Sequence, residues 1–215
     1  MEVKVKMNIL FLHGLGQNAE SWETTIENIN SEHSSICLKL NDLVCKNELT
    51  YQNLYSRLSK FCSASKKPVN LCGLSLGGVL AMNYAIDHPE AVRSLVLIAT
   101  PYKMPKHLLR FQNLLFRFFP NSMFQQLGLT RQEMISLCSE MMDLDFSEKL
   151  NRISCPVLLL CGKKDRSNQQ SSRNLASLIE DAQLQIVEHS GHEINLDAPL
   201  QLADILNGFY SELMD

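Results

Sequence analysis

The sequence lacks any apolar run near the ~18 residues that would suggest a membrane-spanning helix,. Its first apolar run, Ile9 to Leu12, is too short to be the core of a signal peptide,. Nothing in the sequence marks the chain for export. We therefore expect a cytoplasmic protein with no stable membrane association.

Paired cysteines and an excess of one charge are also missing. The seven cysteines are scattered, and no Cys-x-x-Cys pair occurs. This pattern predicts small core residues in a reducing compartment rather than a metal or redox site. The 20 Lys and Arg against 23 Asp and Glu give a net charge of −3, which argues against a nucleic-acid-binding protein. The sequence shows no internal repeat and no low-complexity tract.

What the sequence contains is the composition of one ordinary globular domain. It has 215 residues, of which 45% are apolar and 20% are charged. At about 150 residues per domain, this length favours a single domain with a small insert. A chain of this size buries about 70% of the surface that it exposes when unfolded, so its fold needs no disulfide or metal.

Short apolar runs alternate with helix-like segments along the chain. We expect strands at 8–13, 35–40, 69–74, 92–99, 157–161 and 184–188,. We expect helices at 21–29, with Ser21 as a candidate N-cap, and at 51–61, 76–88, 169–180 and 199–214,. Apolar strands separated by helices predict an α/β fold, in which helices cover both faces of a mostly parallel open sheet.

The stretch 101–152 is too long for an ordinary connection between two strands. Its first part, 106–119, is rich in Leu and Phe, and its second part, 131–149, is acidic. Both parts are typical of helices. The sequence therefore predicts a core domain made of 1–100 and 153–215, and a helical lid insert at 101–152.

A candidate nucleophile lies between an expected strand and an expected helix. The sequence Gly73-Leu74-Ser75-Leu76-Gly77 fits the G-x-S-x-G pattern of a nucleophile elbow,. Small residues are needed there because the strand and the helix approach each other closely. A structural turn without chemistry is the alternative interpretation.

A serine nucleophile needs a base that is oriented by an acid. His192 follows the last expected strand and is the favoured base over His189, which lies at the end of that strand. Asp165 follows the fifth expected strand and is the candidate acid; the alternative is that it only caps a turn. The chain order Ser75, Asp165, His192 is the order of hydrolase sheets.

Two backbone N–H groups complete the predicted site. Negative charge that develops on an attacked carbonyl oxygen needs fixed donors. The N–H of Leu76 opens the helix after Ser75, and the N–H of Leu15 lies in the loop His13-Gly14-Leu15-Gly16. We expect His13 to hold that loop by hydrogen bonds rather than to act in catalysis.

These motifs resemble those of the α/β-hydrolase superfamily, above all of small single-domain bacterial carboxylesterases. The resemblance covers 8–214 apart from the insert. It rests on the oxyanion loop and first helix at 13–22, the elbow at 73–78, the acid strand at 156–165 and the histidine loop at 191–199. Relatives usually carry two further strands before the oxyanion strand, whereas seven residues precede the strand expected at 8–13 here. The resemblance therefore implies six strands in the order 2-1-3-4-5-6, lacking the usual first two.

The resemblance implies a serine hydrolase that acts through an acyl-enzyme. We expect it to cleave carboxylic esters or thioesters of small to medium apolar acyl groups, with no cofactor and no metal. Partners other than a small-molecule substrate are not expected, and the oligomeric state is open. The expected substrate pocket contains Trp22 and four residues of the insert: Leu108, Phe111, Leu115 and Phe118.

Three alternatives remain open from the sequence. Relatives with this triad cleave carbon–carbon bonds or eliminate pyruvate from a menaquinone precursor, and such anionic substrates would need Arg110, Arg117 or Arg131 in the pocket. A non-catalytic binding protein of the same fold is a second alternative. The third concerns the basic segment of the insert, which could bind an anionic membrane, although a solvated lid face is the preferred interpretation.

Overall fold

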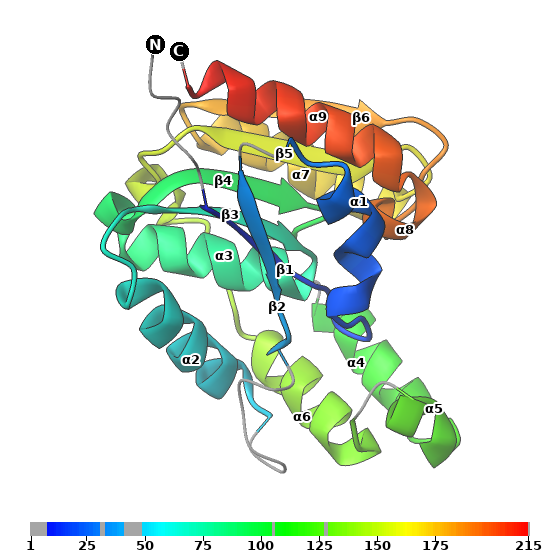
Figure 1. The fold of residues 1–215 in the computed structure, drawn as a ribbon. Helices are drawn as coiled ribbons and strands as arrows, with labels where there is room; N and C mark the ends of the chain where they lie inside the picture. The colour runs from blue at the N-terminus through cyan, green and yellow to red at the C-terminus, as the bar shows by residue number, and fades with distance from the viewer. Residues whose placement is uncertain (1–7, 31–32, 41–48, 105, 127–128, 215) are drawn as a thin grey trace.

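A single parallel sheet of six strands forms the centre of the molecule (Figure 1). The computed structural model describes residues 8–30, 33–40, 49–104, 106–126 and 129–214, except for the side chains of 107, 108, 111, 112 and 126. The strands lie in the order β2-β1-β3-β4-β5-β6, and every neighbouring pair is parallel. The predicted strand order is therefore confirmed. The strands are β1 (Asn8–Leu12), β2 (Ser34–Leu38), β3 (Val69–Leu74), β4 (Val92–Ile98), β5 (Val157–Gly162) and β6 (Ala182–Val187).

The burial of each strand follows from its place in the sheet. Every residue of β3 and β5 is buried, because helices cover both faces of the sheet at its centre. The edge strands β2 and β6 alternate between more and less exposed residues. The continuous apolar runs in the sequence therefore belong to the central strands.

Helices form a layer on each face of the sheet. One apolar core lies between the sheet and α2 (Tyr51–Ser63), α3 (Leu76–Asp87) and α7 (Arg166–Leu178). A second core lies on the other face, under α1 (Glu23–Glu27) and α9 (Pro199–Glu212). Short helices complete the chain: α8 (Ile194–Asp197) and the 3-10 turns η1 (Ala19–Trp22), η3 (Pro89–Ala91) and η4 (Leu150–Arg152).

Three helices connect β4 to β5 and lie together beyond one end of the sheet (Figure 1). They are α4 (Lys106–Phe116), α5 (Asn121–Gln126) and α6 (Arg131–Met141). The predicted segment 106–119 is shorter in the structure, since α4 ends at Phe116 and Pro120 directly precedes α5. Thr130 and Glu133 form a reciprocal capping box at the start of α6, which fixes where that helix begins.

Two helix starts differ from the prediction. The structure has η1 before α1, so Trp22 rather than Ser21 is the residue preceding α1. Helix α7 begins at Arg166, three residues earlier than predicted, because the Asp165 side chain accepts a hydrogen bond from the Asn168 N–H and caps it,.

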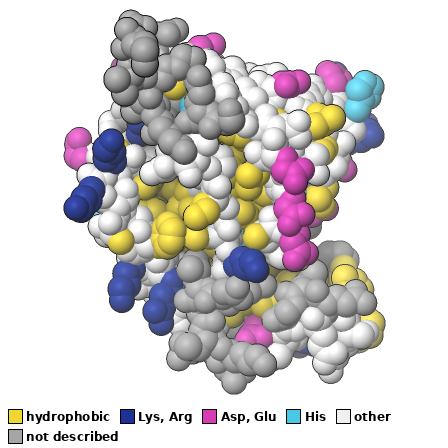
Figure 2. Space-filling view, in the orientation of Figure 1, with side chains coloured by type: hydrophobic (Ala, Val, Ile, Leu, Met, Phe, Trp, Pro, Cys, Tyr) yellow, Lys and Arg dark blue, Asp and Glu magenta, His cyan; other side chains and the backbone are white. Residues whose placement is uncertain are grey.

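The face drawn in Figure 2 carries side chains of both charge signs. Lys and Arg lie mainly on one side of it, and a row of Asp and Glu lies on the other. Hydrophobic side chains gather between them. This face therefore lacks the uniform positive charge that nucleic acid requires.

Helix α3 packs so closely on the sheet that only glycine fits at its second position. A Cβ atom added at Gly77 would lie 2.2 Å from the Leu12 carbonyl oxygen and 2.8 Å from the His13 carbonyl oxygen. Backbone oxygens at the end of β1 cannot yield as a flexible side chain could. The contact therefore sets the distance between α3 and β1.

Replacing Gly77 by Ala should destabilise the protein, because the helix must move away from β1. We expect a loss of about 3 kcal/mol, which corresponds to a fall in Tm of about 10 °C for a chain of this size. Gly208→Ala in α9 is the matched control, because nothing lies within 4 Å of its added Cβ. That substitution should stabilise by roughly 1 kcal/mol. Thermal unfolding followed by circular dichroism measures both, and equal melting temperatures would contradict the prediction.

Candidate active site

Ser75 lies in the sharp turn between β3 and α3, with φ of 51° and ψ of −113°. A positive φ is uncommon for a residue with a side chain and costs conformational energy. The turn is held in place because the Ser75 N–H donates to the Ile98 carbonyl oxygen of β4 at 2.9 Å, and the Ser75 carbonyl accepts from Val79. The strained geometry belongs to a nucleophile elbow, as the G-x-S-x-G pattern predicts.

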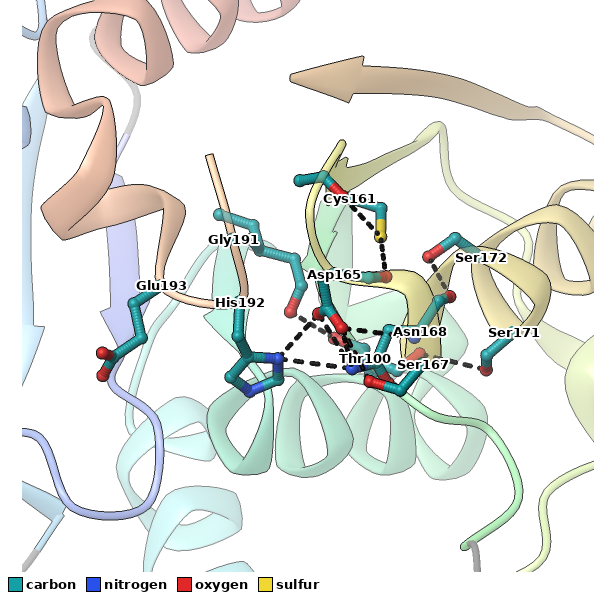
Figure 3. Close-up of polar contacts among 12 residues, drawn as sticks. Thr100, Cys161, Asp165, Ser167, Asn168, Ser171, Ser172, Gly191, His192 and Glu193 are labelled. Carbon is teal, nitrogen blue, oxygen red and sulfur yellow. Dashed lines mark hydrogen bonds and ion pairs between the residues drawn. The ribbon is translucent and has the colours of Figure 1, made fainter. Parts of the chain in front are cut away.

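His192 and Asp165 form a hydrogen-bonded pair near the ends of β6 and β5 (Figure 3). The distance from His192 Nδ1 to Asp165 Oδ2 is 2.8 Å. Asp165 is 6% exposed, whereas the His192 side chain is 43% exposed. An ionised carboxylate can only accept, so Nδ1 carries the proton and Nε2 is left as the acceptor of the neutral ring. This is the tautomer that a general base requires.

The Asp165 carboxylate is stabilised as an anion by four donors. Burial raises the pKa of this carboxyl, but hydrogen bonds from His192, Ser167 and Asn168 outweigh it and lower the pKa to about 2. Ser167 Oγ donates to Oδ1 at 2.8 Å, and the Asn168 side chain donates to Oδ2 at 2.9 Å. The Asn168 backbone N–H donates to Oδ1 at 3.3 Å. Asp165 thus caps α7 and binds His192 at the same time.

His189, the alternative base, lies in the turn after β6 with φ of 63°. Among the described residues, no hydrogen bond joins it to Asp165 or Ser75. The structure therefore brings His192, and not His189, to the acid.

The loop after β1 is ordered by the buried His13. The backbone N–H of Leu40 donates to His13 Nε2 at 3.1 Å, and His13 Nδ1 lies 2.9 Å from the Gly14 carbonyl oxygen. Burial lowers the pKa of His13, so the neutral ring accepts at one nitrogen and donates at the other. Gly16 has φ of 83°, which favours glycine at that turn. His13 has the structural contacts that were predicted for it.

Ser75, Asp165 and His192 line one cavity of about 450 Å³. Leu15, Gly16 and Leu76 also line it. Because Leu76 is the first residue of α3, its N–H has no acceptor within the helix,. The apolar wall of the cavity comes from the segment between β4 and β5: Met104, Leu109, Phe116, Met123, Phe124, Met134, Cys138 and Met141.

The apolar wall is made of other residues than those predicted. Trp22 is fully buried against Phe11, in the core under α1 and α9. Leu115 and Phe118 are 38% and 79% exposed and do not line the cavity. The predicted side chains of Leu108 and Phe111 lie outside the described residues. Leu115 was wrongly expected in the pocket because α4 turns the face with Leu109 and Phe116 toward the cavity.

Part of the apolar wall follows a helical spacing in the sequence that the prediction did not use. Met134, Cys138 and Met141 recur at intervals of four and three residues along α6. This spacing places them on one helix face. Met104, Met123 and Phe124 have no such pattern, because they come from a loop and a short helix.

The arginines proposed for an anionic substrate point elsewhere. Arg110 and Arg117 line a separate surface pocket with Asn113 and Ser139. Arg131 donates to the Phe119 carbonyl oxygen at 2.6 Å. Among the described residues that line the cavity, no Lys or Arg is present.

Residues 9–205 match the sequence profile of the alpha/beta hydrolase family. The chain belongs to the alpha/beta hydrolase family. The predicted superfamily is therefore confirmed.

Relatives and solved structures of this family are enzymes by name. Monoacylglycerol lipase abhd6-B of Xenopus laevis is 23% identical, and the alignment covers 97% of this chain and 76% of that protein. The esterase EaEST of Exiguobacterium antarcticum superimposes with a TM-score of 0.82 at 18% identity, covering 97% of this chain and 93% of that one. MenH of S. aureus gives a TM-score of 0.78 at 19% identity, covering 100% and 97%. Together, the names of the relatives support the prediction of an α/β-hydrolase enzyme.

None of the helices in the described part of the chain is long and apolar enough to cross a membrane. No group of three or more His, Cys, Asp or Glu side chains in that part could hold a metal ion.

Replacing Asp165 by Asn should make the free energy of unfolding less dependent on pH in the acid range. The pKa of the folded carboxyl, about 2, lies below its ordinary value of 3.8. The ionised form therefore stabilises the fold above pH ~4, and this contribution is lost as the pH falls toward ~2. We expect the variant to be less stable at pH 7 by on the order of 1 kcal/mol, because the anion has stronger hydrogen bonds.

Urea unfolding at pH 7 and at pH 3 measures this difference. The difference in free energy of unfolding between the wild type and Asp165→Asn should be smaller at the lower pH. Asp204→Asn, at an exposed site in α9, controls for the loss of one negative charge. A gap of equal size at both pH values would contradict the prediction.

Proposed function

We propose that the protein is a serine hydrolase that cleaves carboxylic esters or thioesters of apolar acyl groups. The observation that carries this proposal is one cavity that combines Ser75 on a strained elbow, the His192–Asp165 pair and a wall of apolar side chains. The apolar wall would hold the acyl group, and Ser75, His192 and Asp165 would carry out the reaction in the same cavity.

In this proposal Ser75 Oγ attacks the acyl carbonyl carbon. His192 Nε2 takes the hydroxyl proton as the C–O bond forms, and Asp165 stabilises the imidazolium without becoming protonated. The tetrahedral intermediate collapses to an acyl-enzyme while His192 returns the proton to the leaving alcohol or thiol. Water then enters, His192 accepts its proton, and the acid is released as Ser75 regains its hydrogen.

The backbone N–H groups of Leu15 and Leu76 are proposed to form the oxyanion hole. Both residues line the cavity beside Ser75. Leu76 adds the positive end of the α3 dipole, which favours negative charge at that position. None of these steps requires a metal or an organic cofactor.

The cavity favours a neutral and flexible acyl group. Its volume lies within the range of about 300–1,000 Å³ that is usual for small-molecule sites,. Methionine side chains adapt to different shapes, and four of them lie in this wall. The relatives named as monoacylglycerol lipases are consistent with such substrates.

We propose that 101–152 is a helical lid on a hydrolase core made of 1–100 and 153–215. The lid would supply the acyl wall, and the core would supply Ser75, Asp165 and His192. The alternative of an anionic carbon–carbon or pyruvate-eliminating substrate has less support, because the candidate arginines do not line the cavity. A non-catalytic role has less support, because the cavity contains both the strained Ser75 and a His192 that is paired with Asp165.

Replacing Ser75 by Ala should abolish hydrolysis, because no other hydroxyl occupies the elbow. We expect turnover of p-nitrophenyl butyrate to fall by at least about 10⁴-fold, the size of effect known for removing such a nucleophile. Labelling with a fluorophosphonate should be lost as well. A variant that kept the wild-type rate would exclude Ser75 as the nucleophile.

Filling the apolar wall should shorten the preferred acyl chain. Cys138 is 1% exposed and lines the cavity, so Cys138→Phe places a ring where the acyl chain would lie. The kcat/KM for p-nitrophenyl decanoate should fall by at least about tenfold, while that for the acetate should change little. Leu115→Ala is the control, because Leu115 lies outside the cavity. An equal loss for both esters in Cys138→Phe would contradict the assigned pocket.

A further inference from the structure

Two buried amide side chains join the loop after β1 to the loop that carries His192. Gln17 is 8% exposed and Asn195 is 2% exposed. Asn195 Nδ2 donates to Gln17 Oε1 at 3.2 Å, and Gln17 Nε2 lies 3.3 Å from Asn195 Oδ1. Each amide thus serves the other as both donor and acceptor.

Further hydrogen bonds join the Gln17–Asn195 pair to both loops. On the first loop, Gln17 Oε1 accepts from the Gly14 N–H at 3.4 Å and from Ser21 Oγ at 3.2 Å. On the second loop, Gln17 Nε2 donates to Glu193 Oε1 at 2.8 Å. Asn195 Nδ2 also donates to the Ser21 carbonyl oxygen at 3.0 Å.

The residues that the pair joins are neighbours of the reacting groups. Gln17 follows Leu15 by two residues, and Asn195 follows His192 by three. Glu193 turns away from Asp165 in Figure 3. Its hydrogen bond with Gln17 therefore holds the backbone next to His192 on the side away from Asp165. The segments are 178 residues apart in sequence, so no local turn can set their separation.

We propose that Gln17 and Asn195 are positioning residues, which set the distance between the oxyanion hole at Leu15 and the base His192. This inference rests on the proposed function. An unpaired buried amide is costly, so the two loops are held where both amides are satisfied. A misplacement of about 1 Å between catalytic groups costs about 10²-fold in rate.

The pair should act on the reaction and not on substrate binding. The acyl wall comes from the segment between β4 and β5, which neither Gln17 nor Asn195 contacts in the described hydrogen bonds. Loss of the pair should therefore lower kcat by about 10- to 100-fold, with KM for a short ester within about twofold of the wild type.

The test compares Gln17→Met, Asn195→Leu and the double variant. Each single variant removes both hydrogen bonds between the two amides, so it should lose both stability and rate. The double variant removes both amides, and replacing both partners by apolar groups relieves much of the stability cost. Its melting temperature should rise above that of the single variants while its rate stays low.

The readouts are kcat and KM for p-nitrophenyl acetate, the rate of Ser75 labelling by a fluorophosphonate, and the melting temperature. Asn70→Leu is the matched control, because Asn70 is also buried in the described core, at 2% exposure. It bonds to Asn8 and Ser94 at the other end of the sheet. This variant should lose stability but keep the labelling rate.

The outcomes separate this inference from the proposed function. Absence of labelling in the wild type would refute the serine nucleophile itself. Labelling of the wild type with an equal rate in Gln17→Met and Asn195→Leu would overturn the positioning role alone. A double variant whose labelling rate recovers together with its melting temperature would also overturn it, because the pair would then be purely structural.

Discussion

The close approach of α3 to the sheet is the constraint on which the rest of the site depends. Gly77 lets the helix backbone meet the end of β1, and the turn before the helix is then too tight for an ordinary residue conformation. Ser75 absorbs this constraint with a positive φ. The strain places a hydroxyl at the carboxyl end of the sheet, where parallel α/β folds bind their ligands. Packing of the core and placement of the Ser75 side chain are therefore one structural feature.

Asp165 links stability to chemistry in a similar way. Its carboxylate caps α7 and holds the His192 ring, so the same negative charge serves the helix N-terminus and the base. Four donors and the helix dipole keep it ionised,. A carboxylate that was needed only as a cap could be replaced by another capping residue. The bond to His192 removes that freedom, because only an anion both fixes the tautomer and stabilises an imidazolium.

The cavity divides its two tasks between two parts of the chain. The ends of the strands bear the polar groups, and the helical segment between β4 and β5 bears the apolar wall. Such an arrangement allows the acyl specificity to change without disturbing the elbow or the acid. Arg110 of α4 lies outside the cavity, since that helix turns another face toward it.

By itself, the sequence determined where the strands lie along the chain and that Ser75, Asp165 and His192 follow strand ends, because these depend on local patterns: apolar runs, a Gly-x-Ser-x-Gly turn, and polar residues just after strands. The order of the strands in the sheet was expected only from the resemblance to α/β hydrolases, and the structure confirms it. Parallel topology then brings strand ends to one edge. Only the tertiary structure decided which helix faces line the cavity, which is why Trp22 and Phe118 were wrongly expected there. It alone revealed the Gln17–Asn195 pair and the hydrogen bond by which His192, already favoured over His189 from the sequence, meets Asp165. Contacts between distant segments depend on the packing of whole elements, and no local pattern in the chain encodes them.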